Sequence, residues 1–168
     1  MGRGGDAYIP GMGPRGKDPE LVYEFSYTAQ LKPPVNFGAG PLGMRMFVEA
    51  TEGRVEGRRL SGTLGSGGGD WLIAGGDGVG RLDVRTQITT DDGACIYAQY
   101  FGMLELNDAV MGAVTAGAAT EFEDQYFRTA PRFETGDERY LWLTQSVFVG
   151  VGHFLPGGVV EYDVYRVT

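Results

Sequence analysis

The chain has 168 residues, and its 14 basic and 22 acidic residues give a net charge of -8. Glycine is frequent, with 29 residues, but 42% of the residues are hydrophobic and 12% are aromatic. This apolar content can offset the entropy lost on folding, which excludes a disordered chain, and the absence of a G-X-Y period excludes a collagen-like rod. We therefore expect a single domain of many short strands joined by tight turns.

Charge and cysteine usage limit the partners and the compartment. The acidic charge disfavours nucleic acid, because phosphate groups are repelled. No apolar run approaches the ~18 residues of a membrane span, and no signal segment opens the chain, so neither a membrane nor secretion is expected. Cys95 is the single cysteine, which is typical of a reducing cytoplasm, and with the single His153 it leaves too few soft ligands for a zinc site.

The first predicted element is a flexible arm over residues 1–20, followed by a single domain over 21–168. Residues 21–28 alternate as a half-buried strand. Its apolar face is Leu21, Tyr23, Phe25 and Tyr27, and its polar face is Glu24, Ser26 and Thr28. A loop through Pro33-Pro34 and 38–43 is expected next, then a strand over 45–51 and a turn over 53–57.

The remainder of the chain continues the strand pattern with one interruption. Further strands are predicted at 58–64, 71–74, 81–89, 94–102, 140–151 and 159–167. Asp91-Asp92-Gly93 predicts a hairpin turn, and Asn107 predicts the cap of a short helix ending near Ala119. No strand–helix–strand spacing occurs, so the fold class is all-β, and an antiparallel barrel is favoured over a sandwich because it leaves no exposed edges.

The strand over 81–89 carries charged residues on one face. Asp83, Arg85 and Gln87 share that face, opposite Leu82 and Val84. In a sandwich this polar face would meet solvent. In a small ligand-binding barrel it could instead line the lumen, where Arg85 would bind a carboxylate or enolate with Asp83 as its counter-ion.

Two carboxylates have surroundings suited to proton transfer. Asp70 follows Gly68-Gly69 and precedes Trp71, so it offers a carboxylate beside a stacking wall, although it could equally cap a turn. Glu134 follows Phe133, and apolar neighbours raise a carboxyl pKa, although Glu134 could equally pair with a surface arginine. His153 is a less favoured candidate, because a lone histidine is more often structural.

The motifs in this order resemble the uncharacterised UPF0311 (DUF3237) family. They run over residues 22–168. The motifs that carry the resemblance are Gly68-Gly69-Asp70-Trp71, Leu82-Asp83-Val84-Arg85, Tyr126-Phe127-Arg128-Thr129, Arg139-Tyr140-x-Trp142-Leu143 and Val164-Tyr165-Arg166-Val167. Thr144 stands where Asn is expected, which weakens a site role there, and residues 103–125 have no clear counterpart.

The resemblance implies a compact antiparallel barrel, similar to the calycin or allene-oxide-cyclase type, with an enclosed pocket. It also implies a cofactor-free lyase or isomerase acting on small aromatic acids, such as a hydroxylamino-benzoate. The arginines, aromatic residues and carboxylates of this chain are compatible with such chemistry.

Acid–base catalysis on a small anionic aromatic or conjugated substrate is the predicted function. The predicted catalytic residues are Asp70 or Glu134 for proton transfer and Arg85 as the carboxylate anchor. The predicted substrate-binding residues are Arg45 and Arg128 as further anchors and Trp71, Tyr97 and Trp142 around the ring. No metal or cofactor is expected, and a homo-oligomer is compatible with the sequence. The alternative is a non-catalytic, lipocalin-like small-molecule carrier. Asp70, Arg85 and Glu134 in one cavity would favour the enzyme over the carrier.

Overall fold

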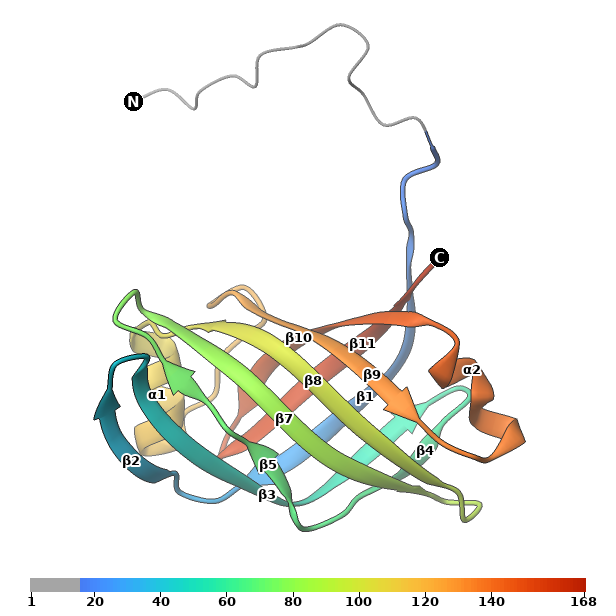
Figure 1. The fold of residues 1–168 in the computed structure, drawn as a ribbon, viewed down its shortest axis with the longest axis horizontal. Helices are drawn as coiled ribbons and strands as arrows, with labels where there is room; N and C mark the ends of the chain where they lie inside the picture. Colours follow the sequence, from blue (N-terminus) through green and yellow to red (C-terminus); the bar gives the residue numbers. More distant parts are fainter. Residues whose placement is uncertain (1–15) are drawn as a thin grey trace, which may run out of the picture.

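The protein is a closed antiparallel β-barrel of eight strand positions, as the alternating pattern predicts (Figure 1). The computed structural model describes residues 16–168, so most of the predicted arm, residues 1–15, lies outside the described residues. The strands are β1 (Leu21–Leu31), β2 (Val35–Gly40), β3 (Gly43–Gly57), β4 (Ser61–Leu64), β5 (Gly68–Asp70), β6 (Ile73–Ala74), β7 (Val79–Thr90), β8 (Cys95–Glu105), β9 (Phe127–Glu134), β10 (Val147–Leu155) and β11 (Val159–Val167). Within residues 16–168 no helix has the length and apolar character needed to cross a membrane.

The barrel closes because β1 pairs with both β11 and β3. From β3 the order continues through β7, β8, β9, β10 and β11, and the short strands β4, β5 and β6 together fill one position between β3 and β7. β2 lies off the barrel wall and pairs with β3 as an exposed hairpin. This hairpin was predicted as a loop, and its uniformly exposed side chains explain why no alternation marks it.

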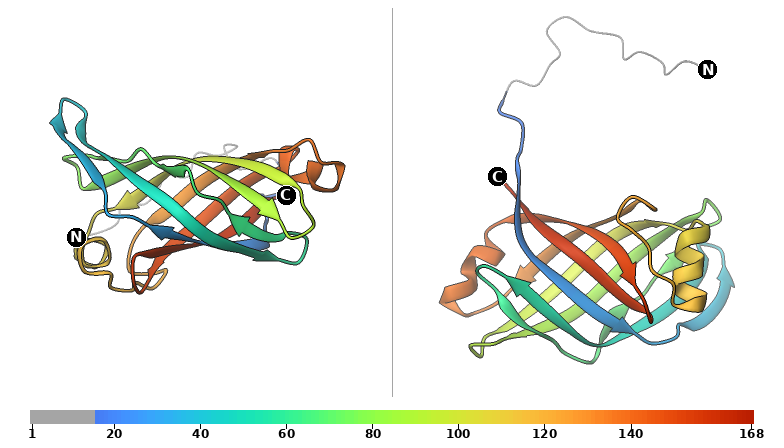
Figure 2. Two further views of the ribbon diagram at one scale, coloured as in Figure 1. Left: turned by 90° about the horizontal axis from the view of Figure 1, so that it is seen from below. Right: turned by 180° about the vertical axis from the view of Figure 1, so that it is seen from behind.

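The two ends of the barrel are covered by different helices and filled differently. Figures 1 and 2 place α1 (Asp108–Ala116) at one end and α2 (Leu141–Thr144) at the other. Next to α2 the interior is packed, with the Phe133 ring lying edge-on to Phe25 at 5.8 Å and to Phe148 at 5.3 Å. The interior next to α1 is hollow.

The helix predicted from Asn107 is confirmed. The Asn107 side chain accepts a hydrogen bond from the Val110 backbone N–H at 3.1 Å. The helix ends at Ala116 rather than near Ala119, because Gly117 adopts a left-handed conformation (φ 64°) that terminates it.

The predicted turn over 53–57 is wrong, because β3 runs straight through it. The backbones of β1 and β3 approach closely at Gly53, a place called the Gly53 corner below. A side chain at Gly53 would overlap the backbone carbonyl of Thr28. The two glycines of the segment, Gly53 and Gly57, therefore serve backbone contact rather than reversal of the chain.

Two further predicted boundaries differ from the structure. The strand expected over 140–151 begins only at Val147, because Asp137 caps a short 3₁₀ turn (Glu138–Tyr140) that leads into α2. In β1 the register shifts between Tyr23 and Phe25, which exposes Tyr23 and buries Glu24. The buried Glu24 carboxylate is paired at 2.7 Å with both Arg59 and Arg166.

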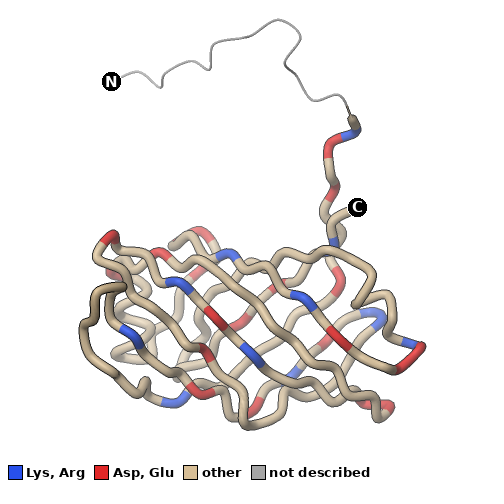
Figure 3. The backbone as a smooth tube through the Cα atoms, in the orientation of Figure 1, with Lys and Arg blue, Asp and Glu red and all other residues tan. Residues whose placement is uncertain are grey.

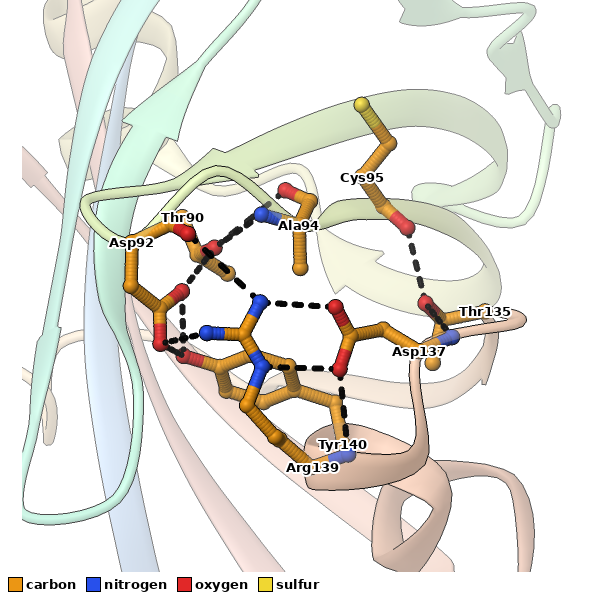
Figure 4. A network of polar contacts seen from close by, with 8 residues as sticks. All are labelled: Thr90, Asp92, Ala94, Cys95, Thr135, Asp137, Arg139 and Tyr140. Carbon is orange, nitrogen blue, oxygen red and sulfur yellow. Dashed lines mark hydrogen bonds and ion pairs between the residues drawn. The ribbon is translucent and has the colours of Figure 1, made fainter.

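A polar network attaches the β7–β8 hairpin to the 3₁₀ turn (Figure 4). The Asp92 carboxylate accepts hydrogen bonds from Thr90 at 2.6 Å and from the Tyr140 hydroxyl at 2.9 Å. The guanidinium of Arg139 lies between Asp92, at 2.8 Å, and Asp137, at 2.7 Å. These partners hold the pKa of Asp92 below its usual range, the Thr90 hydrogen bond first among them.

Replacing Asp92 with Asn is expected to lower the melting temperature at neutral pH. Because the folded pKa of Asp92 is depressed, its stabilising effect is present above the unfolded pKa and is lost as the pH falls through the folded pKa. Thermal melts from about pH 6 to about pH 3 should therefore show the wild type and Asp92→Asn converging in acid. A gap of constant size would contradict the network's role.

Candidate functional site

A cavity of about 500 Å³ occupies the half of the barrel next to α1. Most of its wall is aliphatic or aromatic, contributed by inward positions of the barrel strands. Representative wall residues are Leu72, Leu82, Leu104, Phe127, Phe154 and Val160. A wall of this kind binds molecules with a large apolar surface.

The mouth of the cavity lies beneath α1 and two neighbouring loops. Val114 of α1, the Pro33-Pro34 loop and Gly157 of the β10–β11 turn all line it. The turn is fixed to the helix end by a hydrogen bond from the Gly157 N–H to the Gly117 carbonyl at 3.0 Å. Lys32 also lines the mouth, where its ammonium group pairs with an exposed carboxylate, Glu49, at 3.0 Å.

Asp70 is the carboxylate on the cavity wall. It ends the short strand β5, in register with Val48 of β3 and Val84 of β7, so its side chain shares their inward face. The Asp83 backbone N–H donates to its Oδ1 at 2.9 Å. Burial raises the pKa of Asp70 to about 7, with the negative charge of Asp83 acting the same way, against that hydrogen bond and the charge of Arg45.

Three tyrosines form the floor of the cavity, where the hollow half meets the packed half. Tyr27 of β1 stacks on Tyr162 of β11 at 4.9 Å, and Tyr100 of β8 lies edge-on to Tyr162 at 5.7 Å. Burial raises the pKa of Tyr100 well above its usual range, against opposing hydrogen bonds from Tyr27 and Tyr162. Burial likewise raises the pKa values of Tyr27 and Tyr162. All three are therefore uncharged hydrogen-bonding groups at neutral pH.

This arrangement has a definite chemical capacity. A carboxyl group that titrates near neutral pH can both take and return a proton. Neutral tyrosine hydroxyls nearby can donate to an oxygen on which negative charge develops. The low dielectric of the mainly apolar walls strengthens both interactions.

Of the predicted catalytic residues, Asp70 lines the cavity and the other two lie on the outer face of the barrel. On β7 the inward positions are Leu82, Val84 and Thr86, whereas Arg85 faces outward and pairs with Asp83 at 2.8 Å. The polar face of this strand therefore meets solvent, and the alternative that placed it in the lumen does not hold. Figure 3 shows basic and acidic segments interleaved on this side. Glu134 is exposed at the end of β9, with Arg132 3.5 Å away.

The predicted substrate-binding residues also lie outside the cavity lining. Arg45 donates to the Trp71 carbonyl, and Trp71 packs outside the barrel on Phe47, with ring centres 4.4 Å apart. Tyr97 is partly exposed on the outer face of β8.

The two remaining predicted substrate-binding residues, Arg128 and Trp142, and the less favoured candidate His153 contact other groups of the protein instead of the cavity. Arg128 lies over the Tyr126 ring at 5.2 Å on the outer face of β9. Trp142 of α2 covers the packed end, beneath the guanidinium of Arg59 at 3.7 Å. His153 is buried in β10, with its ring nitrogens bonded to the Thr120 carbonyl and the Glu161 carboxylate.

The floor tyrosines and Thr86 were missed by the sequence analysis. Tyr27 was assigned correctly to an apolar strand face, but nothing local distinguished it from the core residue Phe25. The available signal was three tyrosines near the middle of alternating strands, since a buried hydroxyl in a strand needs a partner.

The sequence of this chain matches a protein family and curated relatives. Residues 19–167 match the family described as a protein of unknown function, DUF3237. A UPF0311 protein of Clostridium acetobutylicum is 34% identical over 144 residues, covering 84% of this chain and 91% of that protein.

Solved structures share the barrel. A conserved protein of unknown function from Rhodopseudomonas palustris superposes with a TM-score of 0.81 at 30% identity, covering 91% of this chain and all of that one. An enzyme from Penicillium herquei, at 22% identity and a TM-score of 0.67 over 94% of this chain and all of that one, has the same fold. The family match and the curated relative together show that the chain belongs to the UPF0311 (DUF3237) family.

Proposed function

We propose that the cavity is the active site of a cofactor-free enzyme that transfers protons to and from a small conjugated or aromatic substrate. The observation that supports this is a single carboxyl group among the described lining residues, that of Asp70, on the wall of a mainly apolar cavity whose floor is made of three tyrosines. A simple container for an apolar molecule has no need of a carboxyl group in its wall, since burying it is costly.

In the proposed reaction the Asp70 carboxylate takes a proton from a carbon next to an oxygen-bearing carbon. A floor hydroxyl, that of Tyr100 or a neighbour, donates to the oxygen as negative charge develops there. Asp70 then returns the proton to another carbon, giving an isomerase, or a leaving group departs, giving a lyase. The choice between the two depends on the substrate.

The charge of the lining refines the predicted substrate class. Among the described lining residues Lys32 is the cation, and it lies at the mouth, paired with Glu49. An anionic group on the substrate would therefore stay at the mouth, and the buried portion is uncharged.

Exchange of carbon-bound hydrogen in D₂O tests the proposal without knowledge of the natural substrate. Cyclic enones and phenols are incubated with the protein, and the loss of proton signals is followed by NMR. Asp70→Asn is expected to slow exchange by about 100-fold or more, and the wild-type rate should rise with pH through about 7, because the ionised carboxylate is the base.

Glu134→Gln is the matched carboxylate substitution for that experiment. Glu134 lies on the outer face, so its substitution should leave exchange unchanged. If Glu134→Gln removes exchange and Asp70→Asn does not, Asp70 is not the base. Tight binding of the panel with no acceleration of exchange would favour the carrier, which the mainly apolar wall also suits.

A further inference from the structure

One polar side chain in the cavity lining has no hydrogen-bond partner. Thr86 occupies an inward position of β7, between Val84 and Ile88, and it lines the cavity. Its Oγ1 is buried, and the structure gives it no partner among residues 16–168. Buried hydroxyls are normally hydrogen-bonded, so an orphan in a cavity wall indicates a group supplied by a ligand.

The strand register places this hydroxyl at the floor. Val84 is in register with both Asp70 and Tyr100, which fixes the level of the carboxyl group. Thr86 is the next inward residue toward the packed end and pairs with Ala98, a neighbour of the packed core. Thr86 therefore lies one step deeper in the barrel than Asp70.

The backbone of a glycine in β5 lies against this hydroxyl. Gly68 of β5 is in register with Ala50 of β3, which lines the cavity, so a side chain at position 68 would also point inward. A Cβ there would lie 2.6 Å from the Arg85 carbonyl oxygen and 2.9 Å from the Thr86 Oγ1, so no side chain fits between β5 and β7 at this point, and Gly68 offers the hydroxyl no side-chain partner.

Apart from Asp70, the polar side chains that line this deep part of the cavity are uncharged. Thr86 and the three floor tyrosines offer hydroxyls that donate and accept, and Lys32 lies at the opposite end, at the mouth. Uncharged hydroxyls in an apolar cavity suit a carbonyl or hydroxyl oxygen and disfavour a carboxylate, which would lose its hydration without gaining a cation.

We propose that the cavity selects apolar ketones or phenols that enter oxygen-first, with Thr86 as the residue that recognises the oxygen. The apolar skeleton then lies along the walls toward α1, and the carbon next to the oxygen-bearing carbon lies at the level of Asp70. This inference rests on the proposed function for the role of Asp70 only, because recognition of the oxygen is a binding property.

Binding of 2-naphthol, naphthalene and 2-naphthoate, measured by calorimetry, tests the proposal. The wild type should bind 2-naphthol at least tenfold more tightly than naphthalene, and 2-naphthoate more weakly than 2-naphthol. Thr86→Val, which has the same shape, should reduce the preference for 2-naphthol to about twofold or less without weakening naphthalene. Thr86→Ser should keep the preference.

Thr89→Val is the matched control, since Thr89 lies on the outer face of the same strand. It should bind all three compounds as the wild type does. Thr86→Val should melt no lower than the wild type, because it removes an unpaired buried hydroxyl, so a loss of preference cannot be ascribed to misfolding.

The outcomes separate this inference from the proposed function. A preference for 2-naphthol that survives in Thr86→Val overturns the inference, as does a wild type that binds naphthalene or 2-naphthoate equally well. A Thr86-dependent preference without any hydrogen exchange would support oxygen-first binding while contradicting the catalytic proposal. Hydrogen exchange combined with a 2-naphthol preference that does not depend on Thr86 would support the catalytic proposal and contradict oxygen-first binding at Thr86.

Discussion

Asp70→Asn is expected to stabilise the protein by about 2–4 kcal/mol at pH 8, equivalent to a rise in melting temperature of about 5–15 °C. Burial raises the pKa of Asp70 to about 7, from an ordinary value of 3.8. Each unit of that shift corresponds to about 1.4 kcal/mol, so the ionised carboxylate is a substantial cost to the folded state. Asn keeps the shape and can still accept the hydrogen bond from the Asp83 N–H.

The effect has a definite dependence on pH. Because the folded pKa of Asp70 is raised, the folded chain keeps a proton that the unfolded chain has lost between about pH 4 and pH 7. Wild-type stability contributed by this group therefore falls as pH rises through that window. Urea unfolding should show equal stabilities for wild type and Asp70→Asn near pH 4 and the full difference by pH 8.

Glu123→Gln provides the control for a carboxyl removed from the surface. Glu123 is exposed, so its substitution should change stability little at any pH. A gain in Asp70→Asn that is the same at pH 4 and pH 8 would show that the carboxyl group is not buried in its charged form. A gain in stability confined to high pH would show that the ionised Asp70 carboxylate destabilises the folded protein, as expected of a buried carboxyl group that is kept for proton transfer.

Gly53→Ala should destabilise the barrel by about 3 kcal/mol or more, lowering the melting temperature by about 6–12 °C or preventing folding. The added Cβ would overlap the Thr28 carbonyl oxygen and lie 2.9 Å from its carbon. Both are backbone atoms of a paired strand, so no side-chain rotation relieves the clash. β1 would have to separate from β3, which opens the barrel.

Gly40→Ala is the matched substitution in β2. Its nearest neighbour would be the Gly43 carbonyl oxygen at 3.8 Å, an ordinary contact, so stability should change by less than about 1 kcal/mol. Thermal melts of the two variants side by side give the comparison. Equal melting temperatures for Gly53→Ala and the wild type would mean that β1 and β3 are farther apart than the structure shows.

The fold class could be predicted from the sequence because alternation is a local property. The runs over 21–28 and 81–89 mark strands without any knowledge of their partners, and the Asp92-Gly93 turn joins the second of these runs to the strand that follows it. The corner at Gly53 could not be recognised, since a glycine needed for backbone contact and a glycine needed for a turn have the same local signature. Only the pairing of β1 with β3 distinguishes them.

The candidate site was predictable only at Asp70. Its position after two glycines indicated a close approach of backbone to a ligand, and that position does line the cavity. For β7 the alternation separated two faces correctly but carried no information on which one is the interior. The charge of Arg85 suggested a ligand contact, whereas the unremarkable Thr86 on the opposite face lies inside.

The division of the barrel into a packed half and a hollow half has an evolutionary consequence. The aromatic contacts around Phe133 stabilise the fold at one end, while residues such as Leu72 and Val160 shape the space at the other. Substitutions in the hollow half alter which molecule fits without disturbing the contacts that hold the strands together. Such a barrel can acquire new ligands in small steps, each of which leaves a folded protein.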